Sequence, residues 1–180
     1  MTKRSNQGAE TRLRIIASAA DLFHKKGVHA TSPDDVIEAS HTGKGQFYHY
    51  FKSKEGLVHE VLQTHLEAIR AGTAPLNYEI DSWEDLEGWF KAHLQLQKSF
   101  RMTRGCPFGT IGNEVTENDE LIRQDLCLIF EVVRSKLSAF FIKQKAKGAM
   151  LMGKIERSSR PVETTVAEAL AHMRLFVART

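Results

Sequence analysis

Residues 31–54 constrain the fold of this chain most strongly, because they predict two short helices joined by a tight turn. Ser32 is a typical N-cap residue, Pro33 suits the first helical position, and Asp35 follows the cap by three residues, as in a capping box. A second short helix is predicted at about Gly43–Tyr50. Two short helices joined by a turn of about 3–4 residues form a helix-turn-helix, whose second helix enters the DNA major groove.

The flanks of the second helix carry the charge that a phosphate-binding surface needs. Residues 39–54 contain no Asp or Glu but carry Lys44, Lys52 and Lys54. The net charge of the whole chain is only +3. The local distribution of charge, rather than the overall balance, therefore indicates a nucleic-acid partner.

The run from Gly45 to Glu55, preceded by a helical segment at 11–27, resembles the N-terminal domain of TetR-family transcriptional regulators. The resemblance covers about residues 9–65. Two positions depart from the family pattern: His41 replaces a turn glycine, and Gly43 replaces a serine at the next helix start. A residue with a side chain holds a positive φ less readily than glycine does. We expect Thr42 to cap the second helix instead of the usual serine.

The resemblance implies a ligand-responsive repressor. A homodimer would bind a palindromic double-stranded DNA operator, and a small apolar or aromatic effector would release it by favouring a conformation with badly spaced recognition helices. We expect no cofactor. Two alternatives remain open: a helical small-molecule-binding protein or enzyme that kept the N-terminal fold, and a ligand-independent activator.

The outward side of the second helix supplies the candidate DNA contacts. Gln46 can pair with adenine and Lys44 can donate to guanine, while Tyr48 and His49 can donate to phosphate. Lys54 begins the next helix, where a phosphate is favoured at the helix N-terminus. The resemblance adds a phosphate contact early in the first of the two short helices. The predicted DNA-binding set is Thr31, Thr42, Lys44, Gln46, Tyr48, His49 and Lys54.

Apolar residues at helical spacing predict an all-α chain, and no strand pattern is present. We expect a three-helix helix-turn-helix DNA-binding domain at residues 1–60 and a helical ligand-binding and dimerisation domain at residues 61–180. Residues 1–8 are predicted to be disordered, and Phe47, Tyr50 and Phe51 to face inward. Besides the helix-turn-helix, helices are predicted at about 9–26, 54–71, 82–102, 111–116, 119–145, 149–157 and 161–179. The apolar face of the first is predicted to be Leu13, Ile16, Ala17, Ala20 and Phe23.

Aromatic residues gather beside a helix break at Arg104–Gly109, where packing is hard to close. This pattern predicts an apolar pocket, with Cys106 in a turn buried near it. His93 fits either the pocket or an ordinary core position with its polar atoms satisfied. The predicted lining is Trp89, His93, Phe100, Cys106, Phe108, Ile111 and Phe130.

Two apolar helices are predicted at the end of the chain, and their apolar stripes need a partner surface. Two-fold symmetry would place two recognition helices about 34–36 Å apart, as a palindrome requires. We therefore expect a four-helix interface, two helices from each subunit, formed by Met150, Ile155, Val166, Leu170 and Met173. The preceding segment reaches Gly148 without a turn signal, so we hypothesise that residues are absent between Lys147 and Gly148.

Other functional classes find little support in the sequence. The eight histidines show no metal-ligand spacing, so we expect no metal site. Cys106 and Cys127 form no CxxC motif and are predicted to be reduced thiols. No apolar run approaches the roughly 18 residues of a membrane span, and the N-terminus lacks the apolar core of a signal peptide. A cytoplasmic, non-enzymatic protein is therefore expected.

Overall fold

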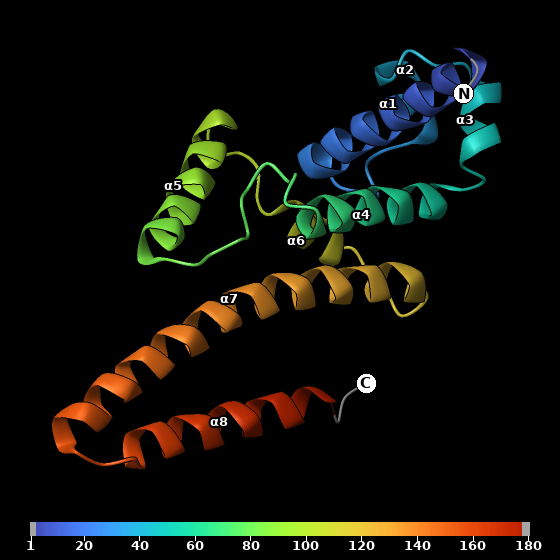
Figure 1. Ribbon diagram of the computed structural model, residues 1–180. Coiled ribbons are helices and arrows are strands. Elements are labelled where there is room, and N and C mark those ends of the chain that lie inside the picture. The colour runs from blue at the N-terminus through green and yellow to red at the C-terminus, as the bar shows by residue number, and fades with distance from the viewer. Residues whose placement is uncertain (1–2, 178–180) are drawn as a thin grey trace.

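The computed structural model describes residues 3–177, except for the side chains of residues 3–6, 153, 169 and 172–177. All regular structure in this range is helical, which confirms the all-α prediction (Figure 1). The eight helices of the described range are α1 Lys3–Lys26, α2 Pro33–Ala39, α3 Lys44–Tyr50, α4 Lys54–Arg70, α5 Trp83–Ser99, α6 Pro107–Gly112, α7 Glu120–Glu156 and α8 Arg160–Val177.

Helix α1 differs from its prediction at its start and in its buried face. It begins at Lys3, so residues 3–8 are helical rather than disordered. Its buried side chains are Ile15, Ile16, Ala19 and Phe23, whereas Leu13 is 55% exposed. Leu13 lies about 200° around the helix from the buried Ile15 at 3.6 residues per turn, and so it is on nearly the opposite side of α1. Of the predicted face, Ile16 and Phe23 are buried and Ala20 packs against the core, whereas Leu13 and Ala17 are exposed.

One hydrophobic core joins the N-terminal helices to α6 and α7. Phe23, Phe47, Phe51, Leu62 and Ile129 are almost completely buried in it. Helix α4 packs along the first half of α7, and α1 packs on both α4 and α6. Because the core continues from α1 to α7, no gap in it marks a domain boundary, and the division at residue 60 stays a prediction.

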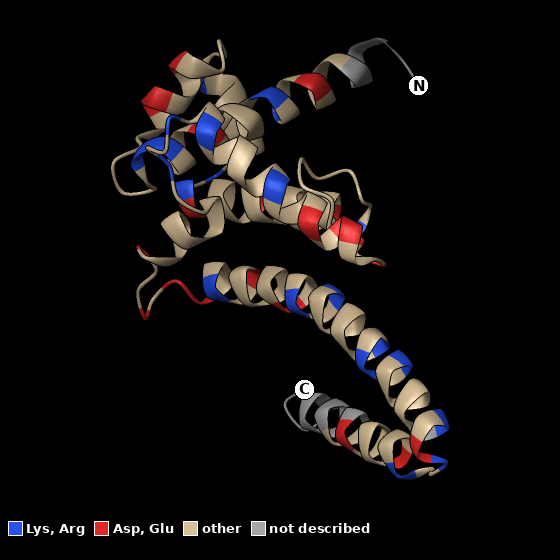
Figure 2. Cartoon of the chain, turned by 90° about the vertical axis from the view of Figure 1, so that its left-hand side faces the viewer, with Lys and Arg blue, Asp and Glu red and all other residues tan. Residues whose placement is uncertain are grey.

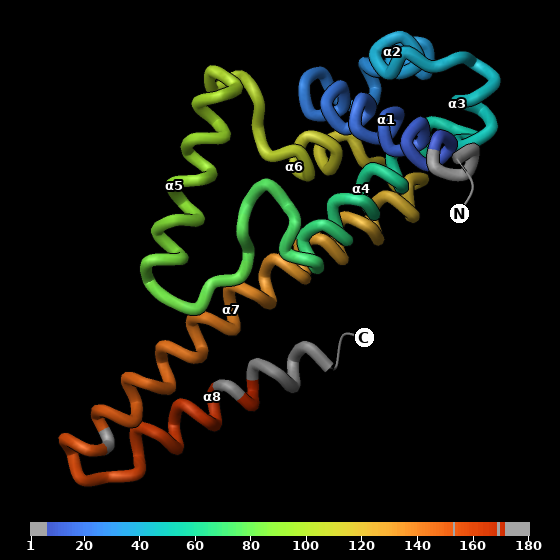
Figure 3. Tube along the Cα trace, turned by 45° about the horizontal axis from the view of Figure 1, so that its top comes forward, coloured from blue at the N-terminus to red at the C-terminus, as the bar shows by residue number. Residues whose placement is uncertain are grey.

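The C-terminal part departs from the compact arrangement of the first four helices. Helix α5 stands beside the body and contacts α7 through a small second cluster of Ile80, Leu86 and Phe140. Helix α8 turns back along the C-terminal half of α7, and this helical hairpin projects from the body (Figure 3). None of the described helices combines the length and apolarity needed to cross a membrane.

Helices α6 and α7 differ from the predicted elements. Helix α6 is Pro107–Gly112 rather than 111–116, because Pro107 occupies its first turn and starts it early. Helix α7 runs without a break through Lys147 and Gly148, so the predicted separate helices and the absent residues between them are both wrong. A glycine in an exposed helix interior costs only about 1 kcal/mol, and Gly148 meets no neighbouring side chain.

Lys and Arg positions recur along α7 (Figure 2), and three of its lysines form ion pairs with neighbouring segments. Lys136 pairs with Glu79, and Lys143 Nζ lies 2.8 Å from an Asp81 carboxylate oxygen, both on the loop that precedes α5. Lys145 pairs with Glu168 of α8. These surface ion pairs contribute little stability individually, but they account for much of the positive charge along α7 without a nucleic-acid partner.

Candidate nucleic-acid interface

Helices α2 and α3 form the predicted helix-turn-helix, and the start of α2 is built as the sequence indicates. The Ser32 hydroxyl accepts from Asp35 N–H at 3.1 Å, and the Asp35 carboxylate accepts from Ser32 N–H at 2.6 Å. This reciprocal capping box is confirmed. These hydrogen bonds from Ser32, together with Lys26 Nζ at 3.1 Å, lower the pKa of Asp35 from 3.8 to about 2.

The turn between α2 and α3 places a non-glycine residue in the left-handed region. His41 has a φ of 51° at the position where the TetR-family sequence pattern has glycine. The Ser40 and Thr42 hydroxyl oxygens lie 2.8 Å apart beside it, and Arg14 Nε donates to the Ser40 carbonyl at 2.8 Å. The turn is therefore held from both sides, by its own hydroxyls and by α1, although it lacks the usual glycine.

The N-terminus of α3 is capped differently from the prediction. Gly43, not Thr42, is the N-cap residue, and the Gln46 side-chain oxygen accepts from Gly43 N–H at 3.3 Å. The Thr42 hydroxyl faces Ser40 instead. Gln46 therefore closes the first turn of α3 in the DNA-free chain.

Helix α3 separates an inward aromatic side from an outward polar side. Phe47 is fully buried, whereas Tyr48 is 51% exposed. Phe51 is buried as predicted, but Tyr50 is only half-buried. The exposed positions are Lys44, Gly45, Gln46, Tyr48 and His49, which contain four of the predicted DNA contacts.

Lys44 is held only loosely on this outward side. Its ammonium lies 3.1 Å from an Asp34 carboxylate oxygen, and both side chains are about two-thirds exposed. Exposed pairs of this kind contribute about 0–1 kcal/mol. Lys44 can therefore exchange Asp34 for a phosphate or a base edge at little cost.

Thr31 and Lys54 lie in a different setting from the other predicted contacts. Thr31 is fully buried and its hydroxyl donates to the Gly27 carbonyl at 2.7 Å, so its side chain is not available to phosphate as expected. Lys54 Nζ donates to the carbonyls of Val28 and Thr31 at 3.0 and 3.2 Å. Two of its three protons therefore fix the loop between α1 and α2.

Sequence patterns missed Arg14. This exposed side chain lies in α1, and a polar hollow between α1 and α3 includes Arg14, Thr11, Gln46 and Tyr50. Its Nε is used by Ser40, and its remaining N–H donors are suited to phosphate. The sequence did contain a signal for this contact: Arg14 is a basic residue beside the apolar face of the helix that precedes the helix-turn-helix.

The seven residues predicted to line one pocket do not all gather around one hollow: Trp89, Phe108 and Ile111 share the main core, whereas Phe100 and Cys106 lie outside it. Trp89 contacts His93 with the rings tilted and their centroids 4.0 Å apart, and Phe100 packs edge-on against His24 of α1. Phe108 packs against Phe130 and His65, with Ile111 in the same core. Cys106 is exposed rather than buried. The break at 104–109 disperses the aromatic residues because α5 and α6 diverge from it.

The predicted dimer residues lie on the projecting α7–α8 hairpin. The exposed fractions of Met150, Ile155, Val166 and Leu170 range from 43% to 66%. The Met173 side chain lies outside the described residues. The described residues contain no group of three His, Cys, Asp or Glu side chains arranged to hold a metal ion.

With this geometry in place, the chain can be compared with known proteins. Residues 15–61 match the family described as "Bacterial regulatory proteins, tetR family". An uncharacterized HTH-type transcriptional regulator in the lacX 3'region of Lactococcus lactis subsp. lactis is 28% identical over 137 residues, covering 71% of this chain and 66% of that protein. The HTH-type transcriptional repressor DhaR of Mycobacterium sp. (strain GP1) is 24% identical over 185 residues, covering 88% of this chain and 91% of the repressor.

A solved structure supports the fold. The crystal structure of a regulatory protein TetR from Rhodobacter sphaeroides superimposes with a TM-score of 0.55 at 18% identity. The match covers 87% of this chain and 95% of that chain. The shared arrangement therefore includes helices well beyond the helix-turn-helix.

Proposed function

We propose that this chain, a member of the TetR family of transcriptional regulators, is a repressor that binds a palindromic operator as a homodimer and is released by a small ligand. Its family is a class of regulators and not of enzymes. We place the protein in the cytoplasm, where its operator would be. The exposed polar side of α3 is the observation that carries this proposal.

Each exposed side chain of α3 has a distinct part in operator binding. The Gln46 side chain would give up its hydrogen bond with the Gly43 N–H, and its amide would then donate to and accept from an adenine edge. The Lys44 ammonium would exchange the Asp34 carboxylate for a guanine edge. Tyr48 and His49 would hold phosphates, and Arg14 would add a phosphate contact from α1. Phe47 and Phe51 anchor the helix from behind, so the contacts arrive on a rigid support.

Two-fold assembly through the α7–α8 hairpin supplies the second copy of α3. Exposed apolar side chains on both helices of the hairpin support this proposal, because a stripe of that kind is stable in water only when covered. A four-helix arrangement would bury Met150 and Ile155 of α7 against Val166 and Leu170 of α8. The interface then fixes the separation of the two α3 helices.

The effector site is proposed next to Trp89 on α5. The indole N–H of Trp89 is buried and has no hydrogen-bond partner among the described residues. Tyr78 and His93 flank the same ring. An apolar or aromatic ligand with one hydrogen-bond acceptor would satisfy this donor, and it would release DNA by favouring a conformation in which α3 is misplaced.

Selection of operator DNA from a random duplex pool, followed by anisotropy titration of the recovered sequences, tests the proposal. We expect recovered sequences with two-fold symmetry and an affinity that falls steeply with salt. Equal binding to every duplex, or recovery of asymmetric single sites only, would contradict it.

A further inference from the structure

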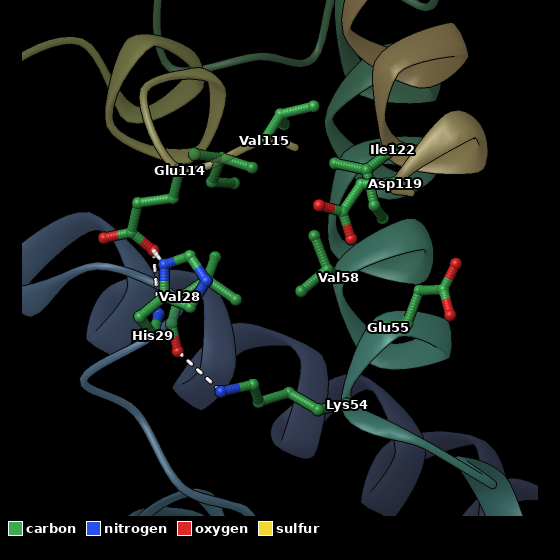
Figure 4. A pocket seen from close by; sticks show the side chains of 10 residues that line it. Val28, His29, Lys54, Glu55, Val58, Glu114, Val115, Asp119 and Ile122 are labelled. Atoms are coloured by element: carbon green, nitrogen blue, oxygen red, sulfur yellow. Dashed lines mark hydrogen bonds and ion pairs between the residues drawn. The ribbon is translucent and has the colours of Figure 1, made fainter. Parts of the chain in front are cut away.

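A small hollow lies where the DNA-binding helices meet α6 and α7 (Figure 4). Its volume is about 130 Å³, and residues from four segments form its wall. The lining consists of Val28 and His29 of the α1–α2 loop, Lys54, Glu55 and Val58 of α4, Ile111, Glu114 and Val115 from α6 and the turn after it, and Asp119 and Ile122 at the start of α7. Of the residues predicted to line a pocket, only Ile111 contributes.

We call this hollow, where the DNA-binding helices meet α6 and α7, the joint cavity, and its floor is apolar. Val58, Ile111 and Ile122 are almost fully buried beneath it, and Val28 and Val115 are half-buried at its sides. Side chains facing an unfilled hollow lack partner atoms on one side and forfeit dispersion contacts. An apolar body that fits the floor would restore these contacts.

The polar groups of the joint cavity are mainly anionic. Glu114 accepts from His29 N–H at 2.7 Å, and its carboxylate lies 3.2 Å from His29 Nδ1. Hydrogen bonds from the Thr116 hydroxyl and backbone N–H hold the pKa of Asp119 below its usual value, so this carboxylate stays ionised at neutral pH. Asp119 points toward the hollow, whereas the Glu55 carboxylate is turned away from it at the edge (Figure 4).

The one lysine of the lining, Lys54, offsets only one of the three negative charges. Lys54 Nζ donates to the carbonyls of Val28 and Thr31. The lining therefore contains three carboxylates, one lysine and one histidine that is paired with Glu114, so its formal charge is negative even with Lys54 included. A bare metal ion does not suit the site, because the described residues provide no converging set of three ligands.

We propose that the joint cavity binds a small organic cation, an ammonium group on an apolar body of about six heavy atoms. An engineered apolar cavity of about 150 Å³ holds benzene, which sets the size. The apolar body would lie on Val58 and Ile122, and the ammonium would face Asp119. This ligand differs from the proposed effector at Trp89 in both location and charge.

A cation in this position would touch both functional parts of the chain at once. The α1–α2 loop and α4 belong to the DNA-binding half, and Glu114 and Asp119 lie in the turn after α6. The Glu114 carboxylate already sits directly over Gly27, where an added Cβ would come within 2.0 Å of it. Occupancy would therefore couple the position of this loop to that of α6 and α7.

Amide NMR titrations of the DNA-free protein with cyclohexylammonium chloride and with cyclohexanol test the site. The two probes have the same ring and differ in charge. We expect the cation to bind about fivefold more tightly, the ratio for two unit charges about 4 Å apart in water. Asp119→Asn should remove this preference, while Glu120→Gln, an adjacent carboxylate outside the lining, should keep it.

A second variant tests the location independently of charge. Val115→Phe would fill the hollow and should abolish binding of both probes. Equal affinity for the two probes, no saturable binding to the wild-type chain, or cation binding unchanged in both Asp119→Asn and Val115→Phe would overturn the inference. Since no DNA is present, these outcomes are independent of whether the chain is a repressor.

Discussion

At the scale of single residues, the clearest departure from the family pattern is His41 at a φ of 51°. The conformation itself was predictable, because the pattern marks this position as a glycine turn. The contacts that hold this turn without a glycine were not predictable, since Arg14 and the Ser40 and Thr42 hydroxyls reach the turn only in the folded chain. Local caps such as Ser32 with Asp35 were predicted correctly because both partners lie within one helical turn.

Replacing His41 with glycine should stabilise the fold. The left-handed conformation costs a residue with a Cβ about 1–2 kcal/mol, and the greater flexibility of unfolded glycine offsets about 0.5–1 kcal/mol of this. We expect His41→Gly to raise the free energy of unfolding by about 0.5–1 kcal/mol in urea titrations. His41→Ala, which keeps a Cβ, should not raise the free energy of unfolding. Equal stability of the two variants would show that the turn is unstrained.

Asp35 predicts a specific acid dependence. Its folded pKa of about 2 lies below the usual 3.8, so its contribution is complete above about pH 4 and is lost as the pH falls toward 2. The stability difference between wild type and Asp35→Asn should therefore shrink as the pH is lowered from 5 to about 2.5. Urea unfolding of both proteins at each pH measures this difference. The contributions of the other carboxylates cancel because wild type and variant share them. A difference that does not change with pH would contradict the capping geometry.

At the scale of elements, sequence signals located helices well where a cap is present and poorly where it is absent. Ser53 and Ser82 cap α4 and α5 as expected. Helix α7 was predicted as two helices, 119–145 and 149–157, but it continues through Gly148, because a single glycine weakens a helix without ending it. Cys106 is exposed rather than buried, and Phe100 lies apart from Phe108, because aromatic content does not determine how α5 and α6 diverge in space.

Lys54 connects two elements, so its removal should act on stability. Lys54→Met keeps the aliphatic stem but leaves the carbonyls of Val28 and Thr31 without their donor. Hydrogen bonds to a charged group contribute about 1.5–3 kcal/mol, and we expect a loss in that range. Lys52→Met on the exposed side is the control and should change the free energy of unfolding by less than about 0.5 kcal/mol. Similar losses in both variants would mean that Lys54 does not hold the loop.

Gln46 should determine one base position in the operator. Gln46→Ala removes the amide that can pair with adenine, which should relax the preference at that position by about 1–3 kcal/mol. Anisotropy titrations against a set of single-base operator variants measure this. Tyr48→Phe, which loses only a phosphate contact, should weaken binding to all of them equally. If every base preference survives in Gln46→Ala, direct reading by Gln46 is wrong.

At the scale of the whole molecule, one helical hairpin is left with apolar side chains in water. The sequence predicted this surface because the stripes of the last two helices were plain, and the four described interface residues are indeed exposed. What the sequence did not predict is that α7 is long enough to carry its share of the surface away from the body. The projecting hairpin leaves α3 at the opposite end free for DNA (Figure 1).

The central claim is that dimerisation through this hairpin makes α3 an operator-binding surface. Analytical ultracentrifugation combined with anisotropy on a palindrome tests it in wild type, in Leu170→Asp and in Thr164→Asp. Thr164 lies on α8 about 240° around the helix from Leu170 and adds the same charge away from the stripe. We predict a dimer that binds the palindrome for wild type and Thr164→Asp, and a folded monomer with little operator affinity for Leu170→Asp. A wild-type chain that sediments as a monomer at micromolar concentration and still binds the palindrome tightly would contradict the account.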